Sequence, residues 1–154
     1  MPKRSAGLLL WRRRADGQPE VLLAHPGGPL FARRDEGVWT IPKGEYGPEE
    51  APELAARREF AEEIGQPPPD GELVPLGEAR QRSGKVNTMW AVEGDLDVRD
   101  VRSNLFTMVW PPRSGTLGEF PEVDAAAWFD LPSARRKIAP GQLPFLDRLA
   151  GQLT

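Results

Sequence analysis

The chain has 154 residues, of which 39% are hydrophobic and 28% charged, with a formal net charge of −3 at pH 7. This length and composition predict one globular domain over residues 1–154, and the acidic balance argues against a duplex nucleic acid partner, which needs a basic surface. With no cysteine and a single histidine, the chain cannot form disulfides, thiolate nucleophiles, or zinc sites made of cysteine or several histidines.

The first apolar run, Ala6–Trp11, predicts a strand rather than a targeting segment. It is shorter than the hydrophobic region of a signal peptide, and three arginines follow it at once. No stretch approaches the length of a membrane-spanning helix. We therefore expect a soluble, cytoplasmic protein without membrane partners.

The N-terminal third predicts a hairpin and a third strand. Ala6–Trp11 and Val21–Ala24 flank an Asp16-Gly17 turn, and a loop rich in Pro and Gly begins at His25. A short strand is expected over Val38–Ile41, ending before Pro42.

The C-terminal half predicts four more strands and two short helices. The strand candidates are Leu73–Arg80, Lys85–Val92, Leu105–Trp110 and Ala126–Phe129. Short helices are expected around Pro132–Lys137 and Gln142–Leu149, interrupted by Pro140-Gly141.

One long helix is expected over Pro52–Ile64. Proline suits the first turn, Gly65 is a natural residue just after the helix end, and the N-cap, Ala51, has no side-chain oxygen. At about 100° per residue, one arc of this helix carries apolar residues, namely Leu54, Phe60, Ala61 and Ile64.

A different arc of the same helix carries Glu59, Glu62 and Glu63. They stand at i, i+3 and i+4, so their carboxylates are neighbours and repel one another. A solvated acidic face is the ordinary interpretation of such a cluster. A bound hard cation is the functional one, because Mg²⁺ prefers oxygen ligands and shares itself between carboxylates and phosphates.

The glutamates belong to a longer pattern with fixed spacing. Gly44 is followed after five residues by Glu50, then after seven by Arg58-Glu59, and then by Glu62-Glu63 and Gly65. This pattern resembles the Nudix box. The family has an aliphatic residue where this chain has Gln66, which is the only departure. The order of the other expected elements is also similar to that of Nudix domains.

The resemblance implies an α/β fold, an α/β/α sandwich around a mixed sheet. It implies that Glu59, Glu62 and Glu63, with the carbonyl of Gly44, hold one or more Mg²⁺ or Mn²⁺ ions. It also implies that Arg58 orients a catalytic glutamate, with Glu50 as its partner.

Many relatives use a further carboxylate from outside the box. In mutator-type and dinucleoside-polyphosphate-type relatives, a catalytic glutamate lies six positions before a tryptophan on the last strand. Glu122 has this spacing from Trp128, and Glu119 is the second candidate. The general base is therefore expected to be Glu62 or Glu122, and an acidic loop is the alternative interpretation of the region around Glu122.

Basic side chains near the box are candidates for binding substrate phosphates. Lys43 follows a strand end beside the expected metal site, and Arg34 and Lys85 are further candidates. His25 and Tyr46 also lie in loops where they could touch a substrate. For most of these residues a solvated or packing role is the alternative.

The predicted activity is Mg²⁺-dependent cleavage of a phosphoanhydride in a nucleoside-diphosphate-linked small molecule. Dinucleoside polyphosphates, nucleoside triphosphates, ADP-ribose and capped RNA all stay open as substrates. The alternatives are a Nudix module that binds nucleotides without cleaving them, and an acidic interaction domain whose helix matches by chance. The residues leave the number of metal ions and the oligomeric state open.

Overall fold

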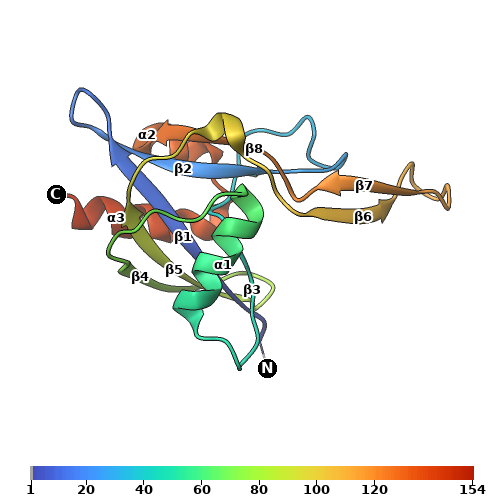
Figure 1. Ribbon diagram of the computed structural model, residues 1–154, viewed down its shortest axis with the longest axis horizontal. Coiled ribbons are helices and arrows are strands. Elements are labelled where there is room, and N and C mark those ends of the chain that lie inside the picture. Colours follow the sequence, from blue (N-terminus) through green and yellow to red (C-terminus); the bar gives the residue numbers. More distant parts are fainter. Residues whose placement is uncertain (1) are drawn as a thin grey trace.

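A mixed β-sheet forms the centre of the protein and helices cover both of its faces (Figure 1). The computed structural model describes residues 2–154. The sheet has the strand order β4-β5-β1-β2-β8, and β3 pairs with β1. Its strands are β1 (Arg4–Arg13), β2 (Pro19–Pro26), β3 (Lys43–Glu45), β4 (Val74–Arg80), β5 (Val86–Glu93) and β8 (Val123–Asp130).

Helix α1 (Pro52–Ile64) lies on one face of the sheet, and α2 (Leu131–Lys137) and α3 (Leu143–Gln152) lie on the other (Figure 1). Two short 3₁₀ segments, η1 (Val98–Asp100) and η2 (Pro140–Gln142), complete the helical elements. The predicted α/β/α sandwich around a mixed sheet is confirmed. None of the helices within residues 2–154 is both long and apolar enough to cross a bilayer.

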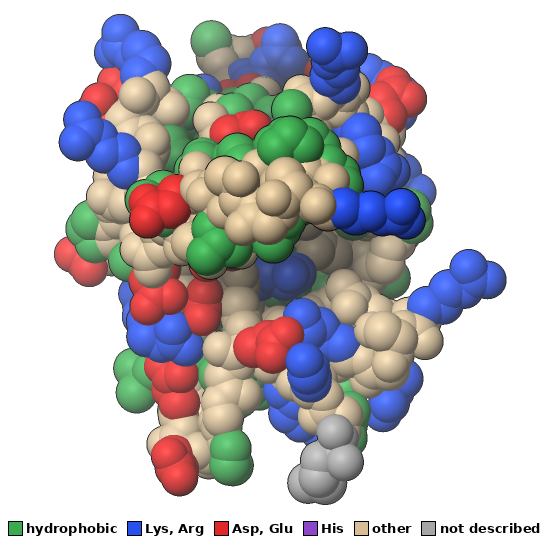
Figure 2. Space-filling view, turned by 90° about the vertical axis from the view of Figure 1, so that its right-hand side faces the viewer, with side chains coloured by type: hydrophobic (Ala, Val, Ile, Leu, Met, Phe, Trp, Pro, Cys, Tyr) green, Lys and Arg blue, Asp and Glu red, His purple; other side chains and the backbone are tan. Residues whose placement is uncertain are grey.

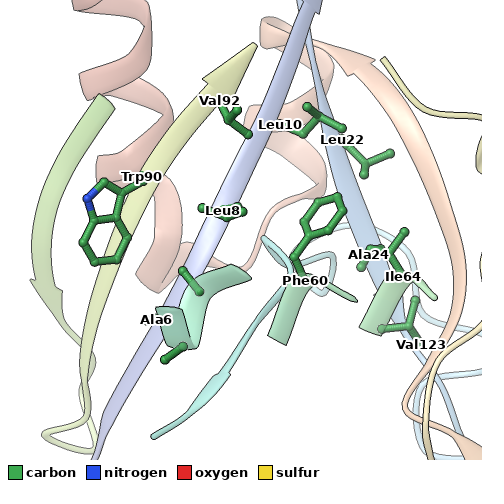
Figure 3. Close-up of a cluster of buried hydrophobic side chains, with 12 residues drawn as sticks. Ala6, Leu8, Leu10, Leu22, Ala24, Phe60, Ile64, Trp90, Val92 and Val123 are labelled. Atoms are coloured by element: carbon green, nitrogen blue, oxygen red, sulfur yellow. The ribbon is translucent and has the colours of Figure 1, made fainter. Parts of the chain in front are cut away.

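Each face of the sheet has its own hydrophobic core because side chains alternate along a strand. On β1, Leu8 and Leu10 point toward α1, whereas Leu9 points toward α3. Figure 3 shows the first core, in which Phe60 of α1 packs against residues from β1 and β2. The first of these cores holds α1 in a fixed position on the sheet.

Strands β1 and β2 pair only near their connecting turn, where Trp11 lies opposite Val21, and they diverge beyond it. The segment 38–45 fills the gap between them. Thr40 pairs with Ala24, the Leu8 N–H donates to the carbonyl of Pro42, and Gly44 pairs with Ala6. The predicted strand Val38–Ile41 is wrong, because that stretch makes isolated bridges and the strand begins only at Lys43.

Strands β6 (Leu105–Val109) and β7 (Leu117–Pro121) form a separate two-stranded sheet, the β6–β7 arm, which projects from the body (Figure 1). β7 was not expected from the sequence, because its five residues include Gly, Glu and Pro, which are depleted in strands. The remaining predicted elements are confirmed with shifts of a few residues at their ends, and β8 begins at Val123 rather than Ala126.

Candidate active site

The long helix has the ends that the sequence predicts. α1 begins at Pro52 with Ala51 as an N-cap that makes no side-chain hydrogen bond, and Gly65 adopts a left-handed conformation with φ of 80°. The N–H of Gly65 donates to the carbonyl of Ala61 and ends the helix. Glu59, Glu62 and Glu63 are thereby placed on the last turns of a rigid element.

The buried face of α1 differs from the predicted arc. Phe60 and Ile64 are fully buried as expected, but Leu54 is 62% exposed. Ala55 and Ala56 contact the sheet instead. Small side chains at these positions allow close approach of helix and strand. This rotation also places Glu59 on the buried side of the helix, apart from the solvated face.

Glu59 packs directly against the backbone of Gly44. A Cβ atom placed on Gly44 would lie 1.9 Å from the Glu59 Oε2 atom, so only glycine fits there. Glu59 is 9% exposed, and burial raises the pKa of its carboxyl, partly offset by the Arg58 guanidinium. The fixed spacing between Gly44 and Glu59 in the sequence therefore corresponds to a direct contact.

Arg58 joins several of the acidic groups. It makes a two-pronged pair with Glu50, with Nε–Oε2 and Nη2–Oε1 distances of 2.8 Å. Its Nη1 atom lies 2.8 Å from Glu59 Oε1 and 3.2 Å from both oxygens of Glu62. The pairing with Glu50 raises the pKa of the Arg58 guanidinium further above its ordinary value. Arg58 therefore contacts three of the box glutamates.

Glu63 lies on the side of α1 that faces β3. Its Oε1 atom accepts a hydrogen bond of 3.2 Å from the Lys43 backbone N–H. Burial raises the pKa of the Glu63 carboxyl to about 8, and the charges of Glu59 and Glu122 add to the increase. A carboxylate in such a place is stabilised by a cation, which removes the cost of its charge.

Glu122, between β7 and β8, lies close enough to the helix to raise the pKa of both Glu59 and Glu63. The backbone of Asn104 makes this link, since its N–H donates to the Glu62 carbonyl and its carbonyl accepts from the Glu122 N–H. Sequence reasoning did not identify Asn104, because a backbone contact has no side-chain pattern. Glu119 instead lies on the exposed side of the β6–β7 arm, opposite Thr107.

The residues around Gly44 have the chemistry of a hard-cation site. Within residues 2–154, no three acidic or histidine side chains already converge to enclose an ion, since Arg58 holds oxygens of both Glu59 and Glu62. The donors are nonetheless all oxygens, and the two box glutamates nearest Gly44 carry raised pKa values. These features fit Mg²⁺ or Mn²⁺.

The three basic candidates lie in different places. The side chain of Lys43 leaves β3 on the face opposite α1, where its Cβ would lie 2.8 Å from a Cβ on Gly7. Lys85 lies on that same side and pairs with Glu45 at 3.1 Å. Arg34 lies in the loop after β2, with its guanidinium 5.6 Å from the centre of the Phe31 ring.

His25 lies in β2 rather than in the predicted loop, and it is buried. Its Nδ1 atom lies 2.7 Å from Asp124 Oδ1, and its Nε2 atom lies 2.7 Å from the carbonyl oxygen of Arg34. Both ring nitrogens are thus engaged inside the protein, and the residue anchors the loop after β2.

Figure 2 looks onto the end of the molecule from which the β6–β7 arm projects. Below the arm the surface is hollowed, with acidic and basic side chains on either side and a Lys or Arg side chain at its floor. In Figure 1, β3 and α1 lie below the level of the arm, near the N-terminus. The fold and the box together define a protein of the Nudix type.

Comparison with known proteins establishes the family. The chain matches the NUDIX domain over residues 1–149, and it belongs to the Nudix hydrolase family.

Solved structures share the fold. A C. elegans Ap4A hydrolase is 22% identical with a TM-score of 0.69, covering 98% of this chain and 97% of that one. The NUDIX domain of Shewanella oneidensis NrtR, solved with ADP ribose, is 18% identical with a TM-score of 0.66, covering 100% of this chain and 90% of that one. These identities show a common fold.

A further relative is similar in sequence over a shorter segment of the chain. A putative 8-oxo-dGTP diphosphatase 3 of Mycobacterium tuberculosis is 44% identical over 61 residues, which is 40% of this chain and 27% of that protein. The matched segment therefore spans about a quarter of the curated relative's length.

Proposed function

We propose that the protein is a Mg²⁺- or Mn²⁺-dependent pyrophosphohydrolase. Its substrate would be a small molecule in which a nucleoside diphosphate forms part of a phosphoanhydride, such as a dinucleoside polyphosphate, a nucleoside triphosphate or ADP-ribose. The observation that carries the proposal is the packing of Glu59 against Gly44, with Glu62 and Glu122 near enough to raise the pKa of the Glu59 carboxyl and Glu63 bonded to the Lys43 N–H. The activities after which the Ap4A hydrolase and the putative 8-oxo-dGTP diphosphatase are named agree with this class.

Glu59, Glu62 and Glu63, with the Gly44 carbonyl, would hold the cation. When bound, a divalent cation polarises phosphate oxygens and lowers the pKa of the attacking water. Arg58 acts as a positioning residue, because its contacts fix Glu50, Glu59 and Glu62 relative to one another. Lys43 would bind a phosphate only where the substrate extends past β3, because the Lys43 side chain lies on the face opposite α1.

Glu122 is the better candidate for the general base. Among the hydrogen bonds of residues 2–154 none engages its carboxylate, whereas both oxygens of Glu62 accept from Arg58. A base needs a free lone pair within reach of the water. Water oxygen would bond to phosphorus, its proton would pass to Glu122, and the leaving phosphate would keep the electron pair of the broken P–O bond. The products would be a nucleoside monophosphate and the remaining phosphorylated fragment.

The test is a hydrolysis panel with product identification. The full chain would be incubated with diadenosine tetraphosphate, ADP-ribose and the nucleoside triphosphates, with Mg²⁺, with Mn²⁺ and with EDTA. We expect metal-dependent release of a nucleoside monophosphate, and a loss of turnover by orders of magnitude in Glu62→Gln and Glu63→Gln. Glu53→Gln, an exposed acid on the first turn of α1, is the matched control.

A nucleotide-binding module without catalysis is the second candidate, and the same panel separates the two. Binding of a nucleotide by calorimetry without product release under any metal condition would favour the module. Full activity in either box variant would overturn the assignment of the glutamates.

A further inference from the structure

Two fully buried polar side chains lie on the sheet face opposite α1 without hydrogen-bond partners. Ser5 and Asn87 are both 0% exposed, and within residues 2–154 the Ser5 hydroxyl and both polar atoms of the Asn87 amide make no hydrogen bond. A buried amide with neither atom paired costs free energy that the fold does not recover. Such a group calls for an explanation, either an ordered water or a ligand.

Ser5 and Asn87 belong to a row that crosses three neighbouring strands. Ser5 of β1 lies opposite Glu45 of β3 on one side and opposite Asn87 of β5 on the other. Directly opposed residues share a face of the sheet. Gly44, the neighbour of Glu45, faces α1, so this row faces away from the box glutamates.

An ion pair closes over this row. Glu45 ends β3 and Lys85 directly precedes β5, so the two residues stand on either side of β1, about 10 Å apart across two strand spacings. The Lys85 Nζ and Glu45 Oε2 atoms are nevertheless 3.1 Å apart. Their side chains therefore meet over β1, next to Ser5, which lies opposite Glu45. The Glu45 side chain is 51% exposed, and an ion pair this open to water holds weakly and opens readily.

A basic cavity lies directly beside the ion pair. It has a volume of about 530 Å³, and its walls include Glu45 and Lys85 together with Lys3, Arg80 and Gln81. Three of these five side chains are cationic. The cavity therefore suits an anion, and opening of the Glu45–Lys85 pair would connect it to the buried amide.

We propose that Ser5 and Asn87 form a nucleobase-recognition site beneath the Glu45–Lys85 pair, which opens to admit the hydrogen-bonding edge of a base while Lys3, Arg80 and Lys85 bind the attached phosphate. An amide presents one donor and one acceptor side by side, which matches the paired donor and acceptor on a base edge. The ligand class is a nucleoside phosphate. The inference deepens the proposed function, on which it rests for the view that this ligand is part of the substrate.

The geometry also bears on substrate choice. Strand β3 separates the Ser5–Asn87 row from Glu59, so a substrate that uses both must pass around β3 with its base on one side and its phosphoanhydride on the other. The enzyme would then distinguish substrates by their base, and it would discriminate against compounds that carry the same phosphates on a bare ribose.

The test measures binding without turnover. Calorimetric titrations of the full chain in EDTA would use AMP, GMP, CMP and UMP, with ribose 5-phosphate as the probe that lacks a base. We expect at least one nucleotide to bind roughly 10- to 100-fold more tightly than ribose 5-phosphate, the discrimination typical of a paired amide contact. In Asn87→Leu the affinity for that nucleotide should fall to the affinity for ribose 5-phosphate, and in Ser5→Ala it should fall several-fold.

The matched control is Thr88→Val, which changes the next residue of β5 on the opposite face of the sheet and should leave the preference unchanged. Because the Asn87 amide is unpaired, Asn87→Leu should melt no lower than the wild type. Equal binding of all five probes, or a base preference that survives both Asn87→Leu and Ser5→Ala, would overturn the inference. These titrations measure no hydrolysis, so they test the base site separately from the proposed function. If no substrate of the hydrolysis panel were cleaved but binding still depended on the base, the proposed function would be refuted and this site would be supported.

Discussion

Replacing Gly44 with alanine tests the central contact of the site. The added Cβ would lie 1.9 Å from Glu59 Oε2 and 2.0 Å from its Cδ, whereas ordinary contact begins at 3.4 Å. The carboxylate would have to retreat by about 1.5 Å, and Arg58, which holds it from the other side, opposes this movement. The substitution therefore moves the Glu59 carboxylate but removes no carboxylate from the site.

The expected result is a loss of activity that exceeds the loss of stability. A displacement of about 1 Å in a catalytic group can cost on the order of 100-fold in rate, and overpacking of this kind costs about 1–3 kcal/mol. Gly44→Ala should thus lower kcat/KM about 100-fold for the best substrate of the panel, yet stay folded by circular dichroism at 25 °C.

Gly47→Ala is the matched control, since a Cβ there meets nothing within 4 Å, and its activity should equal that of the wild type. A folded Gly44→Ala protein with activity within two-fold of wild type would refute the reasoning.

Three further predictions follow from the site and the core. Arg58→Lys keeps the charge but loses the two-pronged pair with Glu50, so kcat should fall about ten-fold or more while KM changes little; an unchanged kcat would remove the orienting role. In EDTA, folding raises the pKa of Glu63 to about 8 from an ordinary 4.5, so the folded protein binds the extra proton between these values. The free energy of unfolding should therefore fall as pH rises from 4.5 to 8, by up to about 1.4 kcal/mol per pH unit. In Glu63→Gln, denaturant titrations should show no such fall in the free energy of unfolding. If the free energy of unfolding changed with pH equally in the wild type and in Glu63→Gln, the prediction would be contradicted. Phe60→Ala should cost about 3–5 kcal/mol in the same assay, whereas Leu54→Ala, at an exposed position, should cost less than about 0.5 kcal/mol; similar losses would mean that α1 is rotated from the described orientation.

The elements that the sequence predicts well are those with local causes. Pro52 and Gly65 mark both ends of α1 because each has a conformational preference that needs no tertiary contact. The hairpin of β1 and β2 follows from two apolar runs around Asp16-Gly17 for the same reason. The box spacing then predicted which glutamates share a helix face.

Features that depend on tertiary packing could not be predicted from the sequence. Leu54 fits an apolar arc by helical geometry, but Ala55 and Ala56 face the sheet because small residues let the helix approach it. The strand at Val38–Ile41 was misplaced because the divergence of β1 and β2 decides which residues can pair.

The polar row also depends on tertiary structure. Asn87 is a polar residue within the expected strand Lys85–Val92. Its pairing with Ser5, however, requires knowing that β1 and β5 are parallel neighbours. The link from Glu62 to Glu122 passes through the backbone of Asn104 and has no sequence pattern at all.

The most direct test is a calorimetric titration of Mn²⁺ into the metal-free protein at pH 8, where about half of the Glu63 carboxyl groups are ionised before the cation binds. We predict saturable binding in the wild type and in Glu53→Gln, and an affinity for Mn²⁺ at least ten-fold lower in Glu59→Gln and in Glu62→Gln. Absence of binding in the wild type, or equal affinity in all four proteins, would contradict the claim that the glutamates of α1 form a metal site.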